Sequence, residues 1–269
     1  MPTHQLVFGC GEVLARACSE EGEPLVFMAR EGLGAFELNL GEHIVSGDTK
    51  LQTSRMGMLP VLRCSSRDGT ESEACLAQAK KLGAAAVSMR VGTADANAED
   101  SRHLILTVLE MFKGARINLR FEIHPSSAFT GMEQTALWCG MFPEVTLALD
   151  ADMLLKGFDE ATKGLSLIQS PVFCSLVPKT AILRSGIPDS KNPTCEIRDL
   201  WSAVMSHWRR HAPAGRWLLF IFDVDPSQRH AVDPMGTWNF VKHHMKAALS
   251  CWQTALNAPV FPERGQSPS

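Results

Sequence analysis

The sequence predicts a single (β/α)8 barrel, a TIM barrel of the α/β class. Eight short apolar segments recur along the 269 residues, and each is followed by a helical pattern or a long loop. Strict alternation of strand and helix indicates a parallel sheet, and about 250 residues is the usual length of eight such units in this barrel. Because the sequence has no GxGxxG or GxxxxGK[ST] loop, a doubly wound open sheet is the second choice.

Each predicted strand is a short apolar run bounded by polar or turn residues. In order they are QLVFGC (5–10), GAFELNL (34–40), MLPVLRCS (58–65), AAAVSMRVG (84–92), INLRFEIHPSS (117–127), VTLALDAD (145–152), SPVFCSLVP (170–178) and WLLFIFDVDP (217–226).

Apolar residues at helical spacing predict the helices that separate these strands. They fall in 11–33, 71–83, 101–116, 131–142, 196–212 and 236–256, with a short helical segment after residue 152. The stretch KTAILRSGIPDSKNPT (179–194) is rich in Pro, Ser and Gly and is expected to form a long loop after the seventh strand. The barrel is expected to span 1–258, and 259–269 to form a flexible tail.

Composition narrows the function classes. Hydrophobic residues make up 45% and the formal net charge is −3, without a basic stripe, so no nucleic-acid partner is expected. No apolar run approaches the roughly 18 residues of a membrane span, so no membrane partner is expected either. The eight cysteines are scattered, without a CxxC and without a signal peptide, which predicts reduced thiols in a cytoplasmic protein. Barrels of this kind often form homo-oligomers.

Polar residues at strand ends are the functional candidates, because the active site of such a barrel lies at the C-terminal ends of its strands. Three apolar runs end in a carboxylate, at Glu122, Asp150 and Asp223. Three converging carboxylates would repel one another. A bound divalent cation is the least costly way to compensate their negative charges. Oxygen ligands favour Mn²⁺ or Mg²⁺.

Each carboxylate also has a structural interpretation. In this interpretation, Glu122 pairs with Arg63 or Arg90 across the mouth of the barrel. Asp150 and Asp223 cap the helices that follow them, since Asp is a good N-cap residue. His124, which lies on the same face as Glu122 and precedes a proline, is then a hydrogen-bonded loop residue, and Trp238 belongs to the core.

The order of these motifs resembles a known family. LRFEIHPSSAFTGMEQTALW followed by VTLALDADMLLKGFD is similar to the fifth and sixth strands of the xylose isomerase-like TIM barrels, the sugar phosphate isomerase/epimerase superfamily. GAFELNL, SMRVG and FIFDVDPSQ resemble the second, fourth and eighth strands. Three departures stand out: Met153 and Arg90 occupy positions where the family carries histidines, and the predicted seventh strand has no histidine.

The resemblance implies a metal-dependent isomerase, epimerase or dehydratase that acts on a small polyhydroxylated or keto substrate through an enediolate. Glu122 and Asp223 would exchange the proton, with help from His124. Glu122, Asp150 and Asp223 would bind Mn²⁺ or Mg²⁺. The candidates for binding the substrate are Glu37, Arg63, Arg90, Lys179 and Trp238.

Two alternatives remain open at this point. The missing histidines favour a barrel without a metal that binds a small ligand or performs acid/base chemistry with Glu122, His124 and Arg90. A branch of the same superfamily consists of metal-dependent endonucleases for abasic sites. Such an endonuclease would need zinc-binding histidines and a basic face, and this sequence shows neither.

Overall fold

Eight parallel strands close into a barrel in which every strand pairs with its sequence neighbours and β8 pairs with β1. The computed structural model describes residues 4–18, 23–40, 47–156, 170–186, 193–213, 216–223 and 234–257. The strands are β1 (Gln5–Gly11), β2 (Ala35–Asn39), β3 (Leu59–Ser66), β4 (Ala86–Val91), β5 (Asn118–Glu122), β6 (Leu147–Asp150), β7 (Thr180–Ser185) and β8 (Trp217–Phe222). The predicted TIM barrel is confirmed.

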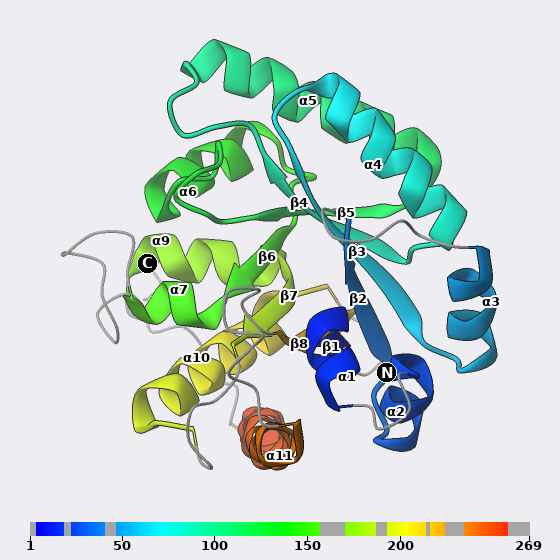
Figure 1. Ribbon diagram of the computed structural model, residues 1–269. Coiled ribbons are helices and arrows are strands. Elements are labelled where there is room, and N and C mark those ends of the chain that lie inside the picture. Colours follow the sequence, from blue (N-terminus) through cyan, green and yellow to red (C-terminus); the bar gives the residue numbers. More distant parts are fainter. Residues whose placement is uncertain are drawn as a thin grey trace, which may run out of the picture.

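Helices surround the strands (Figure 1). They are α1 (Glu12–Cys18), α2 (Pro24–Arg30), α3 (Gly47–Arg55), α4 (Gly69–Leu82), α5 (Ala98–Ala115), α6 (Met132–Met141), α7 (Ala151–Lys156), α9 (Pro171–Leu176), the 3-10 turn η1 (Val177–Lys179), α10 (Cys195–His211) and α11 (Pro234–Asn257). Polar side chains fix several starts: Asp68, Asn97 and Thr194 each accept a hydrogen bond from the first turn of α4, α5 and α10. None of the helices in the described segments is long and apolar enough to cross a membrane.

The seventh strand is the one strand that the sequence analysis placed wrongly. The segment SPVFCSLVP forms α9 and η1, whereas β7 lies inside the stretch that was expected to be a loop. Ser170 caps α9 by accepting a hydrogen bond from the Phe173 amide, and Pro171 occupies the first helical turn. A serine followed by proline is a helix-start signal, because proline has no amide hydrogen to leave unpaired there.

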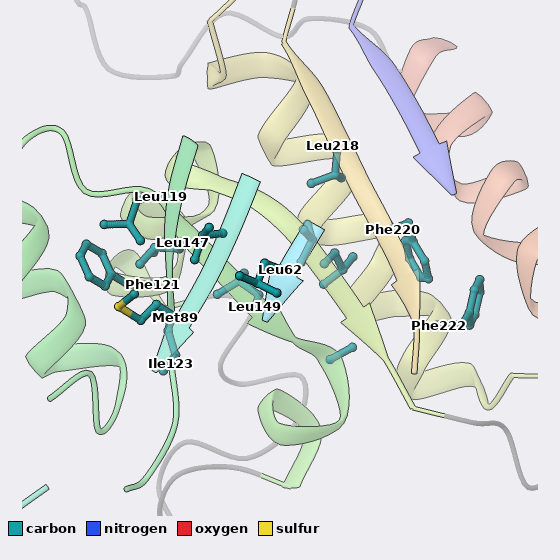
Figure 2. Packing of buried hydrophobic residues seen from close by; sticks show 14 of the residues in the cluster. Leu62, Met89, Leu119, Phe121, Ile123, Leu147, Leu149, Leu218, Phe220 and Phe222 are labelled. Atoms are coloured by element: carbon teal, nitrogen blue, oxygen red, sulfur yellow. The ribbon is translucent and has the colours of Figure 1, made fainter. Parts of the chain in front are cut away.

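Alternation along each strand divides the buried residues into two layers. Odd-numbered residues of β5, such as Leu119 and Phe121, face outward and pack under the helices, and Figure 2 shows part of this layer. The residues of the alternate phase face the barrel interior. The interior layer in the middle of the barrel is Ala35, Val61, Ala86, Ala148, Ile182, Leu219 and Ile221. This layer combines alanines with branched aliphatic side chains and contains no polar residue.

Near the ends of the strands, the inward-facing residues are ionisable rather than apolar. On β5, Arg120 lies two residues before Glu122, on the same face of the strand. On β7 the inward residue after Ile182 is Arg184, and on β2 the one after Ala35 is Glu37. The barrel interior therefore has charged residues at its C-terminal end and an arginine near its N-terminal end.

One expectation about the cysteines is wrong. Cys64 of β3 and Cys75 of α4 form a disulfide, so they are not both reduced thiols. Their separation of 11 residues in the sequence, without a neighbouring cysteine, gave no pattern by which to pair them. The predicted tail at 259–269 lies outside the described residues.

β1 and β2 approach each other closely at Gly9. A β-carbon on Gly9 would lie 2.8 Å from Cβ and 3.0 Å from the carbonyl oxygen of Ala35. We expect Gly9→Ala to lower the free energy of unfolding by about 1–3 kcal/mol, because Cβ and the carbonyl oxygen of Ala35 are both fixed by the backbone and cannot rotate away. Urea denaturation measures this, with Gly114→Ala in α5 as the control. Nothing lies within 4 Å of a β-carbon there, so stability should not fall. Equal midpoints for both variants would contradict the close approach.

Candidate active site

Ionisable side chains from five strands and the residue after β8 meet at the C-terminal end of the barrel. They lie in the layer above the small apolar residues because each is inward-facing and near the end of its strand. The group, called the arginine–carboxylate cluster below, consists of Glu37, Arg63, Arg90, Glu122, Arg184 and Asp223.

Glu122 is the centre of this cluster. Arg63 donates to both of its oxygens, with Nε 2.8 Å from Oε1 and Nη2 3.1 Å from Oε2. Arg90 donates from Nε to Oε2 at 2.9 Å, and the Ser88 hydroxyl donates to Oε1 at 2.8 Å. Nη1 of Arg184 lies 3.2 Å from Oε1. A buried carboxylate is stable only when paired, and Glu122 has three cationic partners and a hydroxyl.

The two outer carboxylates extend the cluster in opposite directions. Arg184 donates two hydrogen bonds to Glu37, from Nε to Oε2 at 2.9 Å and from Nη2 to Oε1. Arg63 donates from Nη1 to Oδ2 of Asp223 at 3.0 Å. A β-carbon on Gly11 of β1 would collide with Oδ1 of Asp223, so glycine at that position makes room for this carboxylate.

Charge pairing shifts the pKa values of Glu122, Arg63 and Arg184. Burial alone would raise the pKa of Glu122, but Arg184, Arg63 and Arg90 hold it well below its usual range. Burial alone would lower the pKa of Arg63, and its neighbours Glu122, Glu37 and Asp223 outweigh that effect and raise it. The pKa of Arg184 is raised in the same way. Glu122 is therefore ionised at neutral pH and a very weak base.

His124 lies beside the cluster in the turn after β5. Its Nδ1 accepts a hydrogen bond from the Ser126 amide at 3.1 Å and lies 2.7 Å from the Ser126 hydroxyl. Because an amide can only donate, Nδ1 carries no proton and the neutral ring carries its proton on Nε2. Burial first, and then the charge of Arg90, lower the pKa of His124. The neutral ring thus offers an N–H donor at neutral pH.

The three carboxylates that were expected to share Mn²⁺ or Mg²⁺ are engaged separately. Oδ1 of Asp150 accepts hydrogen bonds from the amides of Asp152 and Met153, each at 3.0 Å, so it caps α7. Glu122 and Asp223 are bound by arginine. Within the described segments, no group of three or more His, Cys, Asp or Glu side chains is arranged to hold a metal. This donor set does not fit the expected cation site, because the compensating charges are guanidinium groups.

Two predicted substrate-binding residues lie away from the cluster. Lys179 directly precedes β7, which places it at the N-terminal end of the barrel, and its Nζ donates to the Pro143 carbonyl at 2.8 Å. Trp238 is buried in α11 and packs edge-to-face against Phe27, with 4.8 Å between ring centroids. The core interpretation therefore describes Trp238 better than the pocket interpretation.

The sequence analysis missed Arg184, which joins Glu37 to Glu122. A signal was present, since AILR184 repeats the pattern of VLR63, an apolar run that ends in a charged residue. This run was not recognised as a strand, because the preceding segment, 170–178, was assigned as the seventh strand.

Removing the negative charge of Glu122 should be strongly destabilising. Glu122→Gln leaves three arginines, of which Arg184 is fully buried, with only two carboxylates, and loss of one partner of a buried pair costs about 3–5 kcal/mol. The lowered pKa of Glu122 adds stability that is fully present above the usual value of 4.5, and this stability is lost progressively as the pH falls from 4.5 toward the lowered pKa of the folded state. The variant should therefore show a shallower loss of stability between about pH 5 and 3. Urea denaturation across this pH range measures both effects. Glu99→Gln, at an exposed ion pair on α5, is the control and should change little.

The pKa of His124 can be measured by NMR titration of its ring protons. We expect it below the ordinary value of 6.5, and we expect Arg90→Gln to raise it because a neighbouring cation is removed. Lys246→Gln, on the exposed side of α11, should leave it unchanged. A His124 pKa at or above 6.5 in the unaltered protein would contradict the arrangement.

Comparison with known proteins agrees with this architecture. No family model and no curated protein matches the sequence. Among solved structures, an L-ribulose 3-epimerase has a TM-score of 0.70 at 13% identity over 96% of this chain and 100% of that chain. A xylose isomerase-like TIM barrel protein from Mycobacterium smegmatis in complex with magnesium has a TM-score of 0.58 at 11% identity, covering 93% and 97%. A family 2 AP endonuclease from Brucella melitensis has a TM-score of 0.56 at 13% identity, covering 82% and 92%. The chain has the fold of the xylose isomerase-like TIM barrels.

Proposed function

We propose that the mouth of the barrel catalyses metal-independent acid/base chemistry on a small polyhydroxylated or keto substrate that carries an anionic group. The reaction class is isomerisation, epimerisation or dehydration through an enediolate. One observation carries the proposal: Arg63 and Arg90 reach the surface of the cluster while Glu122 holds both guanidinium groups in place. They stand at the end of the barrel where such enzymes react their substrates.

Exposure separates the arginines into two roles. The side chains of Arg63 and Arg90 are 17% and 33% exposed, whereas that of Arg184 is 3% exposed. Arg63 and Arg90 can therefore contact a substrate. Arg184 is buried and pairs with Glu122 inside the barrel. A fixed guanidinium supplies the positive charge and the N–H donors that stabilise a developing oxyanion. In the metal-dependent form of this reaction, a bound metal ion would stabilise the oxyanion instead.

Proton transfer falls to the more exposed acids and bases. Glu122 is a positioning residue rather than the base, because three arginines hold its pKa well below the usual range. The Asp223 side chain is 21% exposed, whereas that of Glu122 is 5% exposed, so Asp223 is the more accessible of these two carboxylates. In the proposed step, Asp223 takes the proton from the carbon beside the substrate carbonyl. The electron pair of the broken C–H bond forms the enediolate, whose oxygen lies against Arg63 and Arg90.

His124 completes the scheme as a hydrogen-bond donor. Its Nε2–H donates to the substrate oxygen on which negative charge develops. Return of the proton from Asp223 to the neighbouring carbon gives an isomer, and return to the opposite face requires a second donor and gives an epimer. Loss of a hydroxyl from the next carbon, which takes the proton from Asp223 and leaves as water, gives dehydration.

The metal-dependent form of the same chemistry would need Glu122 and Asp223 to exchange their arginine partners for a cation. The proposal therefore includes no step through Mn²⁺ or Mg²⁺. A cytoplasmic location, the absence of nucleic-acid and membrane partners, and assembly into homo-oligomers remain predictions.

Exchange of substrate hydrogen for solvent deuterium tests the reaction directly. Purified protein, treated with a chelator and checked by elemental analysis, is incubated in D₂O with hydroxy-ketones and hydroxy-aldehydes, each with and without a carboxylate or phosphate group. NMR follows loss of the C–H signal. We expect exchange with the anionic compounds to survive chelation, and Asp223→Asn to slow it by about 100-fold or more.

The same assay distinguishes binding from chemistry. Arg90→Gln should raise KM for anionic compounds by about tenfold, with a smaller effect on neutral ones, because it removes one charged donor. Lys246→Gln is the control and should leave both constants unchanged. Exchange that disappears with the chelator and returns with Mn²⁺ or Mg²⁺ would overturn the proposal in favour of the metal-dependent enzyme. No exchange with any compound would count against an enzyme of this class.

A further inference from the structure

We propose a second binding site, for an organic anion with an apolar body, at the N-terminal end of the barrel. A cavity of about 760 Å³ lies there, which is within the range of small-molecule sites. It is bounded by the first residues of β4 to β8 and by parts of α5 and α10. The arginine–carboxylate cluster occupies the opposite end, so this site is separate from the proposed active site.

Arg120 is the central polar group of the cavity. Its Nη1 donates to the Leu119 carbonyl at 2.8 Å and to the Thr146 hydroxyl at 2.7 Å. That hydroxyl in turn donates to the Leu119 carbonyl at 2.6 Å. The guanidinium is therefore held in one orientation. A fixed donor loses less freedom on binding than a mobile one.

Two buried polar atoms on the cavity wall lack partners. Nε of Arg120 and Oγ1 of Thr180 are both buried, and neither has a hydrogen-bond partner within the described part of the chain. Buried polar atoms are nearly always hydrogen-bonded, because an unpaired one loses its hydration without compensation. Their occurrence together on one cavity indicates a ligand that supplies an acceptor to Arg120 and a polar atom to Thr180.

Among the described residues, no carboxylate forms an ion pair with Arg120. Burial first, and then the nearby charge of Arg216, lower the pKa of Arg120 to about 10. Three other charged residues line the cavity. Glu110 and Lys113 lie 3.5 Å apart and pair with each other on the surface of α5, and Glu144 is exposed. An anion between Arg120 and Arg216 would relieve the repulsion between them.

The comparison with the other end of the barrel strengthens this argument. Arg63, Arg90 and Arg184 also point into the barrel, and each contacts at least one carboxylate within 3.2 Å. Arg120 shares their inward-facing phase but has no ion pair with any described residue. A purely structural arginine would be expected to have a carboxylate partner here as well.

The remaining walls define the rest of the ligand. Leu109, Ile117 and Leu219 provide apolar surface, and Trp217 is 44% exposed beside them. An indole face and aliphatic side chains suit a flat or aromatic body. The ligand is thus a carboxylate or phosphate joined to an apolar group, rather than a free inorganic anion.

Calorimetric titration of the full-length protein tests the proposal with four probes: phenyl phosphate, phenylacetate, inorganic phosphate and benzyl alcohol. We expect phenyl phosphate or phenylacetate to bind more tightly than the other two, and the preferred probe identifies the anionic group. Arg216→Gln and Arg120→Met should each weaken that binding by about tenfold or more. Arg216 is exposed, so its variant reports on binding even if Arg120→Met fails to fold.

Two further variants locate the binding. Arg102→Gln, in an exposed ion pair on α5, should bind the probes as the unaltered protein does. Arg90→Gln, at the opposite end of the barrel, should also leave this binding unchanged. The proposal is overturned if neither aromatic anion binds at millimolar concentration, if binding survives Arg216→Gln, or if Arg90→Gln abolishes it. Because these readouts do not involve turnover, they are independent of the proposed reaction.

Discussion

The C-terminal end of this barrel depends on the pairing of one buried carboxylate with three arginines. Glu122 has a low pKa because Arg184, Arg63 and Arg90 lie beside it, and Arg63 and Arg184 have raised pKa values despite their burial because Glu122 and Glu37 lie beside both. None of the buried members would be stable there alone, since burying an unpaired charge is costly. The cluster is therefore a cooperative unit, and the positions of Arg63 and Arg90 at the mouth follow from it.

The interior of the barrel contains the same side-chain type in two different environments. At one end, arginines are neutralised by carboxylates, and at the other, Arg120 lies near Arg216 without an ion pair among the described residues. The small middle layer, with Ala35, Ala86 and Ala148, separates the two ends. One end thus combines fixed positive charge with acids and bases, which suits chemistry. The other offers fixed positive charge beside apolar walls, which suits binding.

The sequence was sufficient for the fold and for most of the residues of the cluster. Alternation placed seven strands close to their observed positions, and the rule that active sites lie at strand ends selected Glu37, Arg63, Arg90, Glu122 and Asp223. Two short apolar runs, 170–178 and 180–185, competed for the seventh strand, and periodicity alone cannot separate a buried strand from a short helix. Ser170 and Pro171 carried the decisive signal. The partner of each carboxylate could not be predicted, because pairing depends on the register around a closed barrel.

The charges of the arginine–carboxylate cluster balance without a bound cation. The cluster joins three carboxylates to three guanidinium groups, so its formal charge is zero before any ligand binds. Where the resemblance leads one to expect a histidine on the fourth strand, Arg90 brings a permanent positive charge, and Arg184 brings another from the seventh. A divalent cation would add to these charges, whereas an anionic substrate would meet the exposed edges of Arg63 and Arg90. In the proposed reaction, arginines of the protein thus supply the positive charge that a bound metal ion would otherwise supply.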